Sequence, residues 1–209
     1  MRGEELDAFE AEAQAIEATL GGMPADAWPR PGLGEWSVAE LVAHLVRTAT
    51  RVDAYHGVEV DAHRPDVDRV EYFRVDLEAA APAIAQRARG EAADVDPCTL
   101  ARRFADGWRA SAARAGGLAA DHLLATPHGA MRLDAYLATR VLELVVHHGD
   151  LRAALDQPPA STPDAQWLTM HLLEALLGSP RPRNMGRDRF IRAATGRITV
   201  DDPRFPVLR

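Results

Sequence analysis

Residues 139–151, TRVLELVVHHGDL, put three polar side chains on one narrow stripe of an otherwise apolar helix. On a helix that turns about 100° per residue, Glu143 and His147 lie about 40° apart, and Asp150 lies about 20° to the other side of Glu143. His148 points roughly 140° away from Glu143 by the same geometry. Because a glutamate between two leucines is costly to bury alone, the stripe predicts that a positive partner meets Glu143.

A bound cation is one such partner. Glu143 and His147 are one helical turn apart, as are paired ligands in helical zinc sites. Catalytic zinc takes three protein ligands, and His44 is the best third candidate because it interrupts the apolar run LVAHLV at residues 41–46. The other candidate partner is Arg140 on the same helix. In that case each histidine would be an ordinary half-buried side chain bonded to a carbonyl.

The composition is that of a soluble globular protein. Of the 209 residues, 47% are hydrophobic and 26% are charged, which suits one domain or one domain with an appendage. The net charge of -7 and the lack of a basic cluster argue against a nucleic-acid or anionic-membrane surface. Cys98 is the only cysteine, so any metal must use nitrogen and oxygen ligands. Without an apolar leader or a membrane-length apolar run, we expect a cytoplasmic protein that does not enter the membrane.

Helical periodicity dominates the chain. The spacing of Ser37 and Glu40 is that of a capping box, and Thr162 is expected to cap a later helix. A helical period resumes after residue 68, and we expect Pro82 to kink or restart that helix. Helices joined by short loops, without βαβ alternation, suggest an up-and-down bundle whose facing helices can build a site in its core. The remaining expected elements are helices at residues 4–20, 38–56, 98–115, 134–155, 163–177 and 187–196, a turn or small hairpin at 121–133, and an extended tail at 198–209.

Two motifs carry a resemblance to a known family. The stretch GEWSVAELVAHL at residues 34–45, followed much later by TRVLELVVHHGDL, resembles the actinobacterial mycothiol-dependent maleylpyruvate isomerase family, within the DinB-like superfamily of metal-binding helical bundles. The resemblance covers roughly residues 5–157. It implies an all-α fold, with a DinB-like up-and-down four-helix bundle at residues 1–157. Extra C-terminal helices and a short extended tail would form an appendage packed on the bundle at residues 158–209.

The resemblance also implies roles for individual residues. In the family, the histidine of the first motif and the glutamate and histidine of an E-x3-H-x2-D segment hold a divalent metal, usually zinc. Carried over by motif, these ligands are His44, Glu143 and His147. Asp150 matches the aspartate of that segment, and it is predicted to take part in cofactor binding, either behind a metal ligand or through helix packing.

Family membership implies activation of an external thiol. A metal held by two neutral imidazoles and one carboxylate keeps a net positive charge and an open position, so it can lower the pKa of a bound thiol. In the family this thiol is mycothiol, and with Cys98 as the sole cysteine the nucleophile must come from outside. The resemblance thus implies a mycothiol-dependent transferase or isomerase that adds the thiol to an electrophilic small molecule. An arginine near the family's substrate is matched by Arg69, with Arg74 as the alternative, so Arg69 is the predicted catalytic residue.

Other functions stay open from the sequence alone. A non-catalytic metal-binding bundle could bind a small molecule or a protein partner, and a hydrolase with a zinc-bound hydroxide would use the same ligands. The isomerase of the family carries a larger α/β C-terminal domain, whereas about fifty residues follow the bundle here, so its substrate is not transferred to this chain. The sequence also leaves a homodimer open.

Overall fold

The computed structural model describes residues 3–60, 62–74 and 77–208, and within them the fold is helical with two small strand pairs. Two 3-10 turns, η1 and η2, lie in the connections. The elements run, in chain order, α1 (Glu4–Gly21), η1 (Ala25–Ala27), β1 (Pro31–Leu33), β2 (Trp36–Ser37), α2 (Val38–His56), η2 (Glu71–Phe73), α3 (Leu77–Ala92), α4 (Pro97–Gly116), β3 (Leu123–Thr126), β4 (Gly129–Arg132), α5 (Leu133–Ala154), α6 (Pro163–Leu177) and α7 (Arg187–Ala194).

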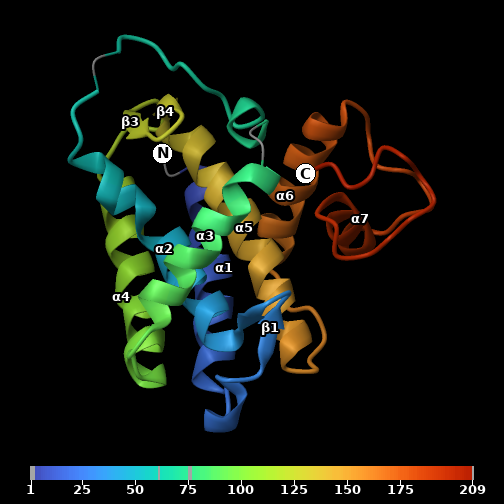
Figure 1. Cartoon of the computed structure of the whole chain (residues 1–209). Helices are drawn as coiled ribbons and strands as arrows, with labels where there is room; N and C mark the ends of the chain where they lie inside the picture. Colours follow the sequence, from blue (N-terminus) through green and yellow to red (C-terminus); the bar gives the residue numbers. More distant parts are fainter. Residues whose placement is uncertain (1–2, 61, 75–76, 209) are drawn as a thin grey trace.

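Helices α1, α2, α4 and α5 form a four-helix bundle (Figure 1). Each of them packs against two of the others, and α3 lies along α2 on the outside of the bundle. The bundle interior is filled by large apolar side chains from all four helices, among them Phe9, Ile16, Leu41, Leu45, Phe104 and Leu142, each at most 1% exposed. The all-α fold and the DinB-like bundle predicted from the sequence are therefore confirmed.

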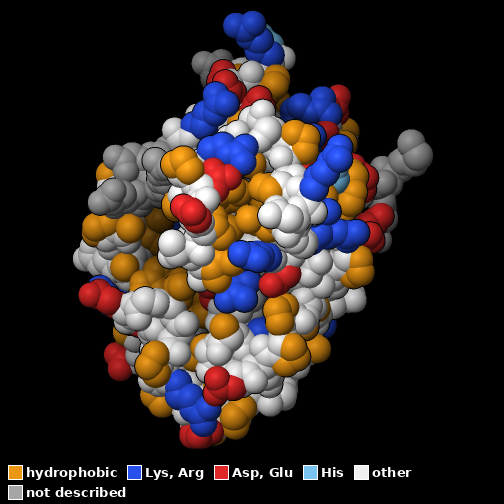
Figure 2. Space-filling view, turned by 90° about the vertical axis from the view of Figure 1, so that its right-hand side faces the viewer, with side chains coloured by type: hydrophobic (Ala, Val, Ile, Leu, Met, Phe, Trp, Pro, Cys, Tyr) orange, Lys and Arg blue, Asp and Glu red, His pale blue; other side chains and the backbone are white. Residues whose placement is uncertain are grey.

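The C-terminal helices extend the bundle on one side. Helix α6 packs on α5 and α1, α7 packs on α6, and both lie beside the bundle in Figure 1. The chain then turns back, and the amides of Val207 and Leu208 donate to the carbonyl of Ala194 at 2.8 and 3.0 Å. Figure 2 shows this face, where arginine, acidic and apolar side chains alternate. Among the described residues, no helix is both long enough and apolar enough to cross a membrane.

One local expectation was wrong in part. Residues 71–73 of the helical period expected after residue 68 form a 3-10 turn, because Asp68 Oδ1 accepts from the amides of Val70 and Glu71 at 2.7 and 2.8 Å. Residues 75 and 76 of that period lie outside the described residues. Helix α3 begins at Leu77 and continues through Pro82 to Ala92. It tolerates the proline because the missing amide removes only one helical hydrogen bond near the start of the helix.

The start of α6 also differs from its expected form. Thr162 occupies the N-cap position of α6, but its side chain makes no capping hydrogen bond. Instead, both its amide and its hydroxyl donate to Glu12 Oε2, at 2.7 and 3.0 Å. The Thr162 side chain therefore bonds to a carboxylate of α1 and does not accept from the first-turn amides of α6. This contact ties the two helices together.

The connections around the bundle position side chains for the site. The short pair β1–β2, which the sequence did not predict, leads directly into α2. The capping box at the start of α2 is present as predicted: the Glu40 amide donates to Ser37 Oγ at 3.3 Å, and the Ser37 amide donates to Glu40 Oε2 at 2.6 Å. The small hairpin expected between residues 121 and 133 is also confirmed as β3–β4.

Candidate metal centre

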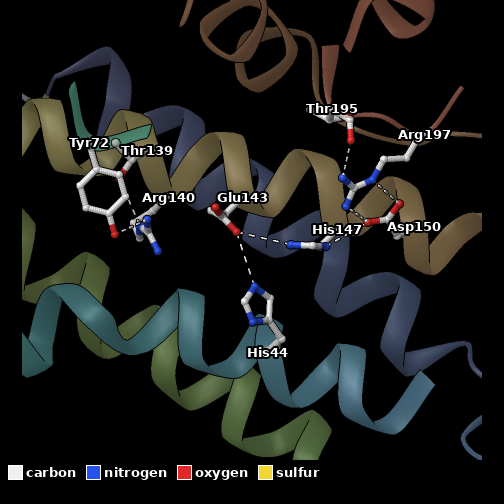
Figure 3. Close-up of polar contacts among 9 residues, drawn as sticks. All are labelled: His44, Tyr72, Thr139, Arg140, Glu143, His147, Asp150, Thr195 and Arg197. Atoms are coloured by element: carbon white, nitrogen blue, oxygen red, sulfur yellow. Dashed lines mark hydrogen bonds and ion pairs between the residues drawn. The ribbon is translucent and has the colours of Figure 1, made fainter. Parts of the chain in front are cut away.

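His44, Glu143 and His147 converge between α2 and α5 (Figure 3). Glu143 Oε2 lies 3.5 Å from Nε2 of His44 and 3.4 Å from Nε2 of His147. One candidate ligand atom from each residue falls within 4.8 Å of the others. The two imidazole rings meet edge to face, with centroids 4.7 Å apart. The structure thus brings together the three residues that the sequence proposed as ligands.

Local structure fixes the direction of His44. The capping box at Ser37 sets where α2 begins, and His44 follows about two turns later on the face toward α5. The Trp36 ring, just before the cap, lies 5.2 Å from the His44 ring. The start of α2 and the wall beside His44 are therefore built by the same short segment.

A chain of hydrogen bonds holds His147 at Nδ1, the ring nitrogen that does not face Glu143. Its Nδ1 lies 3.0 Å from Asp150 Oδ2, and because a carboxylate can only accept, Nδ1 carries the proton. Arg197 donates two hydrogen bonds to the same carboxylate, from Nε to Oδ1 at 3.1 Å and from Nη2 to Oδ2 at 2.7 Å. Arg197 also donates to the carbonyl of Thr195 at 2.7 Å. The segment after α7 therefore orients a side chain of the bundle.

The charges of the cluster depend on one another. Burial alone would raise the pKa of Glu143, but hydrogen bonds from His147 and His44 hold that pKa well below its ordinary value. Burial lowers the pKa of His44, and the neighbouring His147 lowers it further against the effect of Glu143. The pKa of His147 is raised, because its hydrogen bonds to Asp150 and Glu143 outweigh the effect of burial.

The donor set fits a divalent metal. With Nδ1 of His147 protonated toward Asp150, Nε2 faces the Glu143 carboxylate, and only a proton or a cation between the two atoms can satisfy both. Two imidazoles and one carboxylate are the ligand types that zinc takes at catalytic sites, with a further position left for water or substrate. The hydrogen bond from Nδ1 to a carboxylate is the support that metal-bound histidines usually have.

A cavity of about 520 Å³ opens beside the three residues. Its wall is mainly apolar, and it is built from the β1–β2 segment, α2, α3, α5 and the C-terminal segment. His44, Glu143 and His147 all line it, together with Leu33, Glu35, Trp36, Ala81, Ile84, Ala85, Leu142, Val146, Thr195, Arg197 and Leu208. A small molecule in this cavity would contact all three candidate ligands at once.

Arg140, the alternative partner of Glu143, forms its hydrogen bonds with other residues. Arg140 Nη2 donates to the Tyr72 hydroxyl at 3.1 Å, and its Nε donates to Thr139 Oγ1 at 3.2 Å (Figure 3). In the described part of the chain no ion pair joins Arg140 to Glu143. The charge of Arg140 contributes to the low pKa of Glu143 only at a distance.

The predicted catalytic arginine lies elsewhere. Arg69 is exposed, and its Nη1 lies 3.8 Å from Glu5 Oε1 in α1. Arg74 is also exposed and follows the η2 turn. Neither is among the residues that line the cavity at the three converging side chains. The catalytic role of Arg69 stays a prediction, without support from its position.

His148 has a buried partner that the sequence reasoning missed. Its Nδ1 lies 2.7 Å from Glu12 Oε1, its Nε2 lies 3.0 Å from Thr19 Oγ1, and both His148 and Glu12 are fully buried. The signal was present in the sequence, because Glu12 is four residues before Ile16 and shares the apolar face of α1. The two adjacent histidines of α5 therefore have different surroundings: His147 lines the cavity, and His148 lies at the contact with α1.

One comparison with known proteins gives a match. Residues 9–152 match the family model described as the mycothiol maleylpyruvate isomerase N-terminal domain, which is more than half of the chain. No curated protein and no solved structure gives a match. His44, Glu143, His147 and Asp150 fall inside the matched segment, whereas Arg197 lies beyond its end.

Proposed function

The chain belongs to the mycothiol maleylpyruvate isomerase N-terminal domain family, and from that membership we propose that it is a metal-dependent enzyme that activates an external thiol. His44, Glu143 and His147 are the proposed ligands, zinc the proposed metal and mycothiol the proposed thiol. The observation that carries the proposal is the convergence of these three side chains on the wall of one cavity.

In this proposal the metal ligands, Asp150 and Arg197 have separate roles. A divalent metal bound there would lower the pKa of a coordinated thiol and so favour the nucleophilic thiolate near neutral pH. Asp150 keeps the proton of His147 on Nδ1, which leaves Nε2 free to bind the metal. Arg197 holds Asp150 in place for that task.

The cavity suits a small electrophile. Its apolar wall, including Trp36, Ile84 and Leu142, can exclude water from a molecule held beside the proposed ligands. In the proposed reaction the thiol adds across a double bond of the electrophile. Its sulfur forms a bond to the electrophilic carbon, the π electrons move to the neighbouring atom, and the proton lost by the thiol is taken up there. Release of that conjugate would be a transferase reaction, and later loss of the thiol from a rearranged product would be an isomerase reaction.

We also propose that the chain has the two parts expected from the sequence, a metal-binding bundle at residues 1–157 and an appendage at 158–209. The matched segment ends at residue 152, and α6 and α7 follow it, which supports the division. The cytoplasmic location and the homodimer considered from the sequence stay predictions.

Cobalt(II) substitution tests the proposed chemistry directly. The cobalt form should gain a sulfur-to-metal charge-transfer absorption when mycothiol is added, because a coordinated thiolate produces such a band. The same absorption should be missing in His44→Ala and retained in His148→Ala, whose histidine lies outside the cavity. Cobalt bound at the site with no spectral response to mycothiol would contradict thiol activation and favour a non-catalytic metal-binding bundle.

A further inference from the structure

A second group of polar side chains lies one helical turn before Glu143 on α5. Arg140 is 7% exposed, and its guanidinium carbon lies 5.3 Å from the ring centroid of Tyr72 and 4.9 Å from that of Tyr136. Among the described residues its side chain donates to two hydroxyls, those of Tyr72 and Thr139. A nearly buried guanidinium is thus surrounded by aromatic rings and hydroxyls.

Arg51 of α2 lies beside Tyr55, a third tyrosine of the same aromatic group. Its guanidinium carbon lies 5.9 Å from the ring centroid of Tyr55, and that ring is 5.7 Å from the ring of Tyr136. The Nε atom of Arg51 is enclosed and has no hydrogen-bond partner in the described part of the chain. Over the described residues, neither Arg51 nor Arg140 forms an ion pair with a carboxylate, whereas Arg197 and Arg47 do.

The hydroxyl of Tyr136 is a second buried polar group of this kind. Tyr136 is fully buried, and its Oη has no hydrogen-bond partner among the residues that the structure describes. Burial raises the pKa of Tyr136, so the hydroxyl keeps its proton and remains a donor. An unpaired donor of this kind normally costs free energy, and it marks a place where an acceptor is missing.

The balance of charge at this place is positive. Burying a guanidinium without a counter-ion is unfavourable, and aromatic faces and hydroxyls offset only part of that cost. Glu143 is the acid nearest to Arg140 along α5, but its carboxylate faces His44 and His147. The charges of Arg140 and Arg51 both act on the Tyr136 hydroxyl, so an acceptor with negative charge beside that hydroxyl would lie near both arginines.

We propose that Arg140, Arg51, Tyr72 and Tyr136 form a binding site for a small oxyanion group, a carboxylate or a phosphate. Arginine and tyrosine donors are suited to the several acceptor oxygens of such a group. The site lies about 5 Å along α5 from Glu143, so a ligand held there could extend toward the candidate metal centre. The site does not depend on the metal, because none of its four residues is a proposed metal ligand.

Thermal unfolding of the full chain in different anions tests the site. The melting temperature is measured against the concentration of acetate or inorganic phosphate, with chloride at equal ionic strength as the reference, before and after removal of metal with a chelator. We expect a saturable rise with acetate, phosphate or both, because a ligand that binds only the folded state stabilises it. The two oxyanions distinguish a carboxylate site from a phosphate site.

Three variants assign the effect to these residues. Tyr136→Phe should melt like wild type in chloride, because its hydroxyl has no partner to lose, and should bind the oxyanion about fivefold to tenfold more weakly. Arg140→Met should melt at or above the wild-type temperature in chloride and lose the response to oxyanion. Arg114→Met, which removes an exposed arginine of α4 paired with Asp53, should keep that response.

Two results would overturn the proposal. One is an equal melting temperature of the wild type in oxyanion and in chloride. The other is an oxyanion response that Arg140→Met and Tyr136→Phe retain in full. Because the measurement is repeated without metal, a failure here is distinguishable from a failure of the proposed metal chemistry.

Discussion

The Asp150 carboxylate lies 3.0 Å from Nδ1 of His147, on the opposite edge of the ring from the nitrogen that faces Glu143. The same carboxylate is held by two hydrogen bonds from Arg197. These contacts, together with burial, which opposes them, leave the pKa of Asp150 at about 2. Asp150 is thus a charged acceptor that fixes both the tautomer and the direction of His147.

Loss of this support should weaken metal binding without removing a proposed ligand. We expect Asp150→Asn to lower zinc affinity about 10-fold to 100-fold, the usual effect of losing a carboxylate behind a metal-bound histidine. Arg197→Met should act in the same direction and more weakly, since Asp150 itself remains. Competition with a chromophoric chelator gives the affinities.

Arg192→Met is the matched control for Arg197. Arg192 lies on α7, close in sequence, and faces Asp188 at 4.0 Å, on the exposed side of the appendage. Its replacement should leave zinc affinity unchanged. Equal zinc affinities in Asp150→Asn and wild type would show that the hydrogen bond to His147 has no bearing on metal binding.

The buried contact between Glu12 of α1 and His148 of α5 should be important for the stability of the fold and not for metal binding. Glu12→Ala removes the acceptor for both donors of the partly buried Thr162 and for Nδ1 of His148, which would then be buried without a partner. We expect a loss of about 3–5 kcal/mol in the free energy of unfolding, as for other broken buried pairs. Urea unfolding measures it, and Gln14→Ala, an exposed position on the same helix, should change the stability little.

A measurement of metal content distinguishes the role of this contact from that of the candidate metal centre. Folded Glu12→Ala protein should bind as much zinc as wild type, because neither Glu12 nor His148 lines the cavity. A Glu12→Ala variant as stable as wild type would contradict the role assigned to this buried pair.

Glu17 should contribute stability that depends on pH. Burial raises its pKa, but hydrogen bonds from Arg109 and Trp108, at 2.9 and 2.8 Å, lower it below the ordinary value of 4.5. Because the folded-state pKa is depressed, the contribution is present in full above the unfolded-state pKa. It is lost as the pH falls through the folded-state pKa.

The comparison of wild type with Glu17→Gln measures that contribution. The Glu17 side chain is 33% exposed, so solvent screening limits the difference to roughly 0.2–1 kcal/mol near pH 7. The difference, measured by urea unfolding at a series of pH values, should shrink as the pH falls below 4.5. A difference that grows on acidification would show that the sign of the pKa shift is wrong.

The sequence predicted the helices and the candidate ligands because both depend on local periodicity. Glu143 and His147 are one turn apart on one helix, and the capping box at Ser37 fixes the helix that carries His44. Contacts between distant segments have no such local signal. Two such contacts form only when α6 and α7 pack on the bundle: the hydrogen bond from Arg197 to Asp150 and the one from Thr162 to Glu12.

The arginines show the same limit. Sequence position suggested Arg140 as an alternative partner of Glu143, and the family resemblance suggested Arg69 as the residue near the substrate. Packing turns Arg140 toward Tyr72, which comes from the loop between α2 and α3, and places Arg69 beside Glu5. Side-chain direction here is set by which aromatic ring or carboxylate is reached in three dimensions, and the spacing along the chain does not contain that information.

Metal content per chain is the most direct test of the proposed centre. Protein purified without chelator should contain about one equivalent of divalent metal, and His148→Ala should contain as much. His44→Ala and Glu143→Ala should fall far below one equivalent while remaining folded by circular dichroism. Equal metal content in the wild type, His44→Ala and Glu143→Ala would contradict the assignment of these side chains as ligands.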